Sequence, residues 1–133
     1  QVVRATSIPV ATGENEYTRY GFRDLIEHEA ADILTPDAQV LGGITEFMKV
    51  AALAETYNLP IAPHGAQEVH VHLACALPGA LILEVYRDTV DPLRNELFVE
   101  PLRLDEDGCV RVPDKPGLGV DINEELLAPY RIA

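Results

Sequence analysis

Four short apolar runs in the sequence each lead to an acidic residue or a histidine. The runs cover residues 8–11, 33–34, 60–62 and 81–83, and the polar residues that follow them are Glu14, Asp37, His64 and Glu84. Helical periodicity follows the first three runs, and the polar residues lie roughly 20 to 27 positions apart, which suits a strand, a crossover helix and short loops. The sequence therefore predicts four β/α units, or half of a β/α barrel. Because the C-terminal ends of barrel strands meet on one face, the four polar residues are expected to share one site.

The expected elements follow from apolar spacing and from turn residues. Strands are predicted at residues 8–12, 32–35, 61–63 and 80–85, with helices over 18–30, from Thr45 to before Asn58, and over 67–77. The middle helix has the clearest pattern, and Thr45 is expected to cap it. Strands that are apolar on both faces are typical of a parallel sheet covered by helices.

The last third of the sequence does not continue this repeat. An antiparallel hairpin is predicted from residues 101–104 and 109–112 around an Asp-Gly turn, and one helical turn at 124–128. We expect two parts, with residues 1–86 forming barrel units and residues 87–133 packing on another domain or on the barrel rim.

Chain length argues against a closed barrel. The chain has 133 residues, whereas eight β/α units take about 250. Open edges of apolar parallel strands would also invite aggregation unless something covers them. Together with a first residue that is not Met, this predicts a fragment of a larger protein.

Charge and cysteine content narrow the class of partner. Ten Lys and Arg against 22 Asp and Glu give a net charge of −12, which repels polyanions and argues against nucleic acid as a partner. No apolar stretch approaches the roughly 20 residues of a membrane span. The two cysteines lack the spacing of a zinc site or a disulfide scaffold. We therefore expect a cytoplasmic protein that does not associate with membranes.

His64 and Asp37 are the best candidates for proton transfer. Each closes an apolar run, and adjacent units would place them side by side. An aspartate bonded to one imidazole nitrogen fixes the tautomer and leaves the other nitrogen to accept a proton. Taken singly, a loop histidine or a Pro-Asp turn is more often structural, so their adjacent positions carry the hypothesis.

Glu84 and Glu14 are candidates with simple structural alternatives. Glu84 interrupts an apolar run, where a carboxylate must be paired, metal-bound or protonated, although a structural ion pair is an equal possibility. Glu14 is a possible oxygen ligand for a divalent cation, or a solvated acid at a helix start. His70 and His72 point to different faces of one helix, which favours a packed His70 and a surface or interface His72 over metal binding.

Taken together and in order, these motifs resemble the closing half of the enolase superfamily, in particular its mandelate racemase subgroup. The segments that carry the resemblance are Gly13-Glu14-Asn15, Pro36-Asp37-Ala38, Gly42-Gly43-Ile44-Thr45, Pro63-His64-Gly65, Leu83-Glu84 and residues 116–120. Residues 16–22 further resemble members that dehydrate sugar acids.

The resemblance implies strands five to eight of a (β/α)7β barrel and a tail that returns to an α+β capping domain. Glu14 would be the third carboxylate ligand of Mg²⁺, Asp37 and His64 would form an acid/base dyad, and Glu84 would hydrogen-bond the substrate carboxylate. The expected reaction is dehydration of a sugar acid through removal of the proton next to the carboxylate. His64 would either remove that proton or, when protonated, assist the departing hydroxyl.

Two other functions remain open at this point. A racemase or epimerase of a 2-hydroxy acid would use the same dyad, and a noncatalytic half-barrel would use none of it. The earlier metal ligands and the capping loops of the family are absent from the sequence. An upstream part of the same enzyme, on this or a separate chain, is therefore the expected partner, within a homo-oligomer that binds a small sugar acid.

Overall fold

The computed structural model of the protein describes residues 2–87 and 89–132. The chain divides into two compact units, Gln1–Glu84 and Val85–Ala133. Each unit is described by itself below. Within the described residues, no helix has both the length and the apolar character needed to cross a membrane.

The first unit is built on a parallel ladder in chain order. Strand β1 (Ala11–Thr12) pairs in parallel with β2 (Ile33–Leu34). Single parallel bridges then join Leu34 to Ile61 and Ile61 to Ala80. Four successive segments therefore lie next to one another in the order in which they occur, as the β/α repeat predicts.

The observed strands are much shorter than the predicted ones, and proline explains part of the difference. Ile61 donates to the Gly79 carbonyl and accepts from Leu81 N–H at 2.7 Å. The next bond of this parallel ladder would need an N–H from residue 63, which is proline and has none. The predicted strand 80–85 is accordingly reduced to a bridge at Ala80.

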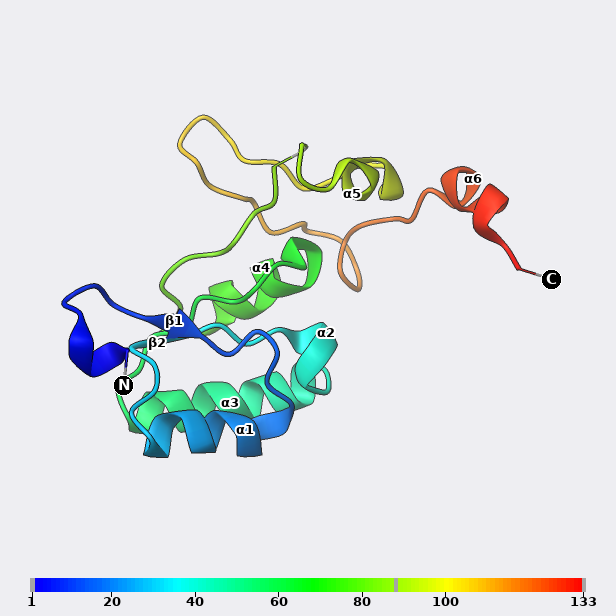
Figure 1. The fold of residues 1–133 in the computed structure, drawn as a ribbon. Helices are drawn as coiled ribbons and strands as arrows, with labels where there is room; N and C mark the ends of the chain where they lie inside the picture. Colours follow the sequence, from blue (N-terminus) through cyan, green and yellow to red (C-terminus); the bar gives the residue numbers. More distant parts are fainter. Residues whose placement is uncertain (1, 88, 133) are drawn as a thin grey trace. The chain divides into compact units, whose positions relative to one another are not determined.

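Helices connect the successive segments of the ladder (Figure 1). The helices of this unit are η1 (Val3–Ala5), α1 (Thr18–Glu27), α2 (Ala38–Leu41), α3 (Ile44–Thr56) and α4 (Gln67–Ala76). Helices α1 and α3 lie side by side. The core is made by apolar residues from these helices and from the ladder: Phe22, Ile26, Ala31, Leu34, Ala38, Leu41, Phe47, Val50, Ala51, Ala54, Ile61 and Leu73.

Several details of the predicted helices were wrong. Helix α1 ends before Ala30 because Glu29 adopts a left-handed conformation, with φ of 50°. Gly43, and not Thr45, is the N-cap of α3, without a side-chain cap bond. Two apolar residues of these helices, Met48 of α3 and Ala76 at the end of α4, are exposed.

The second unit contains short elements and, among its described residues, no buried one. These elements are α5 (Pro92–Leu97), which was not predicted, α6 (Glu124–Leu127) and η2 (Ala128–Tyr130). The predicted hairpin is reduced to one antiparallel bridge between Leu104 and Val110, closed by a turn in which Asp105 accepts the N–H groups of Asp107 and Cys109.

Candidate active site

Asp37 occupies the loop that leaves β2, where it caps the short helix α2. Its Oδ1 accepts the backbone N–H of Gln39 at 2.8 Å. The side chain is only 7% exposed. The cap therefore fixes one carboxylate oxygen and turns the other, Oδ2, toward the neighbouring loop.

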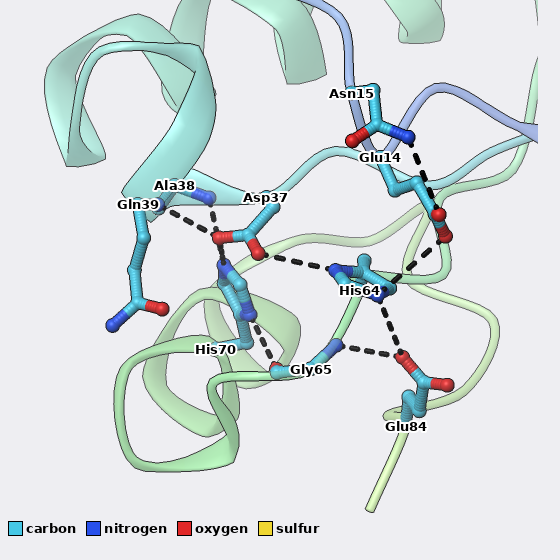
Figure 2. A network of polar contacts seen from close by, with 9 residues as sticks. All are labelled: Glu14, Asn15, Asp37, Ala38, Gln39, His64, Gly65, His70 and Glu84. Carbon is cyan, nitrogen blue, oxygen red and sulfur yellow. Dashed lines mark hydrogen bonds and ion pairs between the residues drawn. The ribbon is translucent and has the colours of Figure 1, made fainter.

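His64 follows Ile61 by three residues and lies beside Asp37 (Figure 2). Its Nδ1 is 3.1 Å from Asp37 Oδ2. An ionised carboxylate can only accept a hydrogen bond, so this contact assigns the proton to Nδ1 of a neutral ring. Nε2 then carries the lone pair, and the ring is oriented as a proton acceptor on that side.

Two glutamates flank the Nε2 side of His64. Glu14 Oε2 lies 3.5 Å from Nε2, and Glu84 Oε2 lies 3.9 Å from it. The four polar residues that close the apolar runs are thus brought together in one cluster, as the β/α repeat predicts (Figure 2). Three carboxyl groups, those of Glu14, Asp37 and Glu84, therefore surround one imidazole.

Glu84 does not have the buried position that its apolar neighbours predicted. Its side chain is 47% exposed. Its Oε2 accepts the backbone N–H of Gly65 at 2.7 Å. This hydrogen bond to the residue after His64 holds the carboxylate near the imidazole.

These side chains face a pocket of about 650 Å³. Glu14, His64 and Glu84 line it, together with Thr12 and Thr35 from the ends of the two strands. A pocket of this size accommodates a small organic acid. These titratable groups and hydroxyls therefore line a common space at the C-terminal ends of the parallel segments.

Backbone conformation around the pocket is specialised at two loops. Gly13, which precedes Glu14, has φ of +127°, and a Cβ there would lie 2.7 Å from Phe22 Cε1. After His64, Gly65 and Ala66 have φ of 50° and 40°. Positive φ at a non-glycine residue costs free energy, and such strain is concentrated at functional sites.

Glu14 is the carboxylate that the sequence names as a metal ligand, and it lines the pocket. Glu14 is half exposed and close to the Asn15 amide, with 3.4 Å between Asn15 Nδ2 and Glu14 Oε1. Within residues 2–87 and 89–132, no group of three His, Cys, Asp or Glu side chains is arranged to hold a metal. A single carboxylate fits Mg²⁺, which usually binds through one or two carboxylates, water and substrate oxygens.

Sequence reasoning missed part of the polar network. His70 was expected to be packed, and its ring is fully buried, but it also bonds to both loops that carry the His64–Asp37 pair. Glu46 of α3 binds the backbone and guanidinium of Arg19 at the start of α1. Only the first case had a signal in the sequence, the His-x-His motif.

The family model described as "Enolase C-terminal domain-like" matches residues 1–126. The chain belongs to this family. The match confirms the resemblance to the enolase superfamily and the assignment to a TIM-type α/β barrel, of which the chain covers the C-terminal part.

Curated relatives and solved structures agree with this membership. The chain is 38% identical to L-rhamnonate dehydratase of Saccharopolyspora erythraea over 91% of its length, and 32% identical to D-xylonate dehydratase of Haloferax volcanii over 98%. It is similar to L-talarate dehydratase from Polaromonas sp. JS666, solved with Mg and L-glucarate, with 42% identity, a TM-score of 0.81 and 96% coverage.

A second solved structure, an enolase from Bradyrhizobium complexed with magnesium and mandelic acid, has 31% identity, a TM-score of 0.86 and 99% coverage. This chain spans only about a third of each of these proteins: 33% and 32% of the two dehydratases, and 34% and 35% of the two solved chains.

Proposed function

We propose that this chain is the C-terminal part of a Mg²⁺-dependent lyase that dehydrates a sugar acid. The observation that carries the proposal is the orientation of His64, whose Nδ1 contacts buried Asp37 while Nε2 faces the pocket between Glu14 and Glu84. This is the arrangement that a general base needs. The names of the dehydratase relatives support the same reaction class.

His64 is the base in this mechanism. Its Nε2 takes the proton from the carbon next to the substrate carboxylate, and Asp37 stabilises the resulting imidazolium through Nδ1–H. The electron pair moves into the carboxylate to form an enediolate, and its return expels the hydroxyl from the next carbon. The imidazolium then gives its Nε2 proton to this hydroxyl, which leaves as water. His64 is thereby returned to its neutral form.

Glu14 and Glu84 have different roles around the substrate carboxylate. Glu14 would bind Mg²⁺, which when bound supplies positive charge near the carboxylate oxygens. Glu84 would hydrogen-bond the substrate carboxylate, which requires the Glu84 carboxyl to carry a proton. The bond from Gly65 N–H fixes Glu84 Oε2 and leaves the other oxygen for this contact.

An upstream part of the enzyme completes the site in this proposal. Residues 1–86 correspond to barrel strands five to eight, and residues 87–133 form the tail that packs on the barrel and a capping domain. The chain spans about a third of its relatives, and it supplies one carboxylate ligand for a cation. Intact-mass measurement of a purified sample would show whether a larger companion chain is present.

Substitution of His64 tests the proposal in the enzyme completed by its upstream part. We expect His64→Asn to abolish turnover of sugar acids while Mg²⁺ binding, followed by titration calorimetry, is unchanged. Glu14→Gln should instead weaken the affinity for Mg²⁺, and an unchanged Mg²⁺ titration would count against its role as a ligand. A near-normal rate in His64→Asn would remove His64 from the mechanism.

Product analysis separates dehydration from racemisation. Formation of a 2-keto-3-deoxy acid supports the lyase. The neighbour that was solved with mandelic acid gives reason to test the alternative, in which solvent deuterium enters the α position with inversion and no water is lost. Absence of both reactions across a panel of aldonic and aldaric acids would favour a noncatalytic module.

A further inference from the structure

The buried imidazole of His70 lies between the loops that carry Asp37 and His64, outside the pocket. It projects from α4 and is 0% exposed. The pocket-lining residues do not include it, so it does not touch the substrate in the proposed reaction. Its ring packs against Phe47 of α3, with 5.6 Å between ring centroids.

Two backbone groups determine the protonation of this ring. Ala38 N–H lies 2.9 Å from Nε2, and the Gly65 carbonyl lies 2.7 Å from Nδ1. An amide N–H can only donate and a carbonyl can only accept, so Nε2 must be unprotonated and Nδ1 must carry hydrogen. His70 is therefore neutral, with its tautomer fixed by the backbone.

These two bonds close a ring of contacts around the proposed dyad (Figure 2). Ala38 directly follows Asp37, and Gly65 directly follows His64. The Asp37–His64 contact of 3.1 Å and the two bonds of His70 thus connect the same two loops at two places. A change in the separation of the two loops would therefore disturb the His70 bonds and the Asp37–His64 contact together.

We propose that His70 is a positioning residue that sets Asp37 against His64 by tying together the two loops that carry them. The proposal rests on the proposed acid/base function of that pair. Ala38 N–H is one of the first-turn amides of α2 that have no partner within the helix, so His70 also stabilises the start of the helix that Asp37 caps. The left-handed conformation of Ala66 shows that the loop is held in a conformation it would not adopt freely.

Nitrogen NMR on the unsubstituted protein tests the geometric part without any activity. We expect His70 to show the Nδ1–H tautomer near neutral pH and a proton that exchanges slowly with solvent. A ring protonated on Nε2, or on both nitrogens, would overturn the proposal. This result is independent of whether the enzyme proves to be a dehydratase.

Paired variants in the completed enzyme test the positioning role. His70→Phe keeps the contact with Phe47 but removes both hydrogen bonds, and we expect kcat to fall by about 10²-fold with a small change in KM, because misplaced catalytic groups cost rate rather than binding. His70→Gln offers an acceptor and a donor and should restore most of the rate. His28→Gln on the exposed end of α1 is the matched control.

The His64 signal distinguishes positioning from simple loss of folding. In folded His70→Phe, the NMR signal of the proton on His64 Nδ1 should lose the chemical shift that marks its hydrogen bond to Asp37. In His70→Gln this chemical shift should return. The proposal fails if folded His70→Phe keeps this signal or keeps a kcat within twofold of the unsubstituted enzyme.

Discussion

Asp37 carries two functions on a single carboxylate, and substitutions can separate them. Oδ1 caps α2 and Oδ2 contacts His64. Both contacts begin at a side chain that is almost fully buried. At the scale of single residues, this double use explains why a Pro-Asp turn, ordinary by itself, lies at the centre of the site.

Two substitutions of Asp37 should therefore differ. Asn is also a good N-cap, so Asp37→Asn should leave stability nearly unchanged while kcat falls by roughly 10² to 10⁴, the range that general-base catalysis contributes. Asp37→Ala should lose a further ~1 kcal/mol of folding free energy. Urea unfolding and steady-state rates measure both effects, and equal stability of the two variants would contradict the capping role.

Gly13 is required by both its backbone conformation and the space around it. Ala at this position would have an unfavourable φ and a Cβ 2.7 Å from the buried ring of Phe22. We expect Gly13→Ala to cost more than about 1 kcal/mol, measured by urea unfolding of the chain. Gly79→Ala is the control, since φ is not positive there and no atom lies within 4 Å of the added Cβ; a similar loss in both variants would refute the prediction.

At the scale of elements, α1 and α3 are linked by a charge contact. Glu46 accepts the Arg19 backbone N–H at 3.0 Å and its guanidinium at 2.8 Å. These hydrogen bonds, with another from Lys49, lower the pKa of Glu46 from its ordinary 4.5 to about 2, the backbone bond being the largest cause. Glu46 of α3 thus accepts a backbone N–H at the start of α1, whose own N-cap residue makes no side-chain hydrogen bond.

This contact predicts how stability depends on pH. Because folding lowers the pKa of Glu46, its contribution is complete above about pH 4.5 and is lost as the pH falls through about 2. Glu46→Gln should lower the melting temperature by a few degrees near neutral pH, and the difference from the unsubstituted chain should shrink across this interval. Circular dichroism measures it, with exposed Glu55→Gln on α3 as control. A pH-independent difference would rule out the charge contribution.

The second unit should open more readily than the helices of the first. Its described residues include no buried side chain, whereas Phe22 of α1 and Phe47 of α3 are fully buried. Few buried apolar contacts give low local stability. We expect amide hydrogen exchange in α5 and α6 to be much faster than in α1 and α3 when the chain is measured alone. Equal protection in both units would contradict this expectation.

At the scale of the whole molecule, the proposed reaction needs more positive charge near the substrate than this chain supplies. Glu14 is the only proposed cation ligand on a chain with a net charge of −12, so an anionic substrate is repelled unless a cation is held by further ligands. The chain alone should therefore not turn over sugar acids at a measurable rate, and addition of the upstream part should restore turnover with Mg²⁺. Turnover by the purified chain alone would show that no further ligands are needed.

Prediction from sequence was most successful where a repeat was present. The alternation of apolar run, polar residue and helix located all four parallel segments in order, and it placed Glu14, Asp37, His64 and Glu84 near one another, as their distances show. It did not give strand lengths, because the loss of ladder bonds at Pro63 depends on which residue lies opposite. Nor did it give the cap of α3 or the exposed position of Glu84.

Local pattern by itself determined the class of fold and the order of the parallel segments, because periodicity and residue type are properties of neighbours along the chain. The ordered motifs carried the resemblance to the family and named the candidate residues for proton transfer. Only the tertiary structure decided that Nδ1 of His64 contacts Asp37, that Glu84 is held by Gly65 N–H, and that His70 joins the two loops. Hydrogen bonds between loops far apart in sequence depend on distance and direction, and these exist only after the helices have packed.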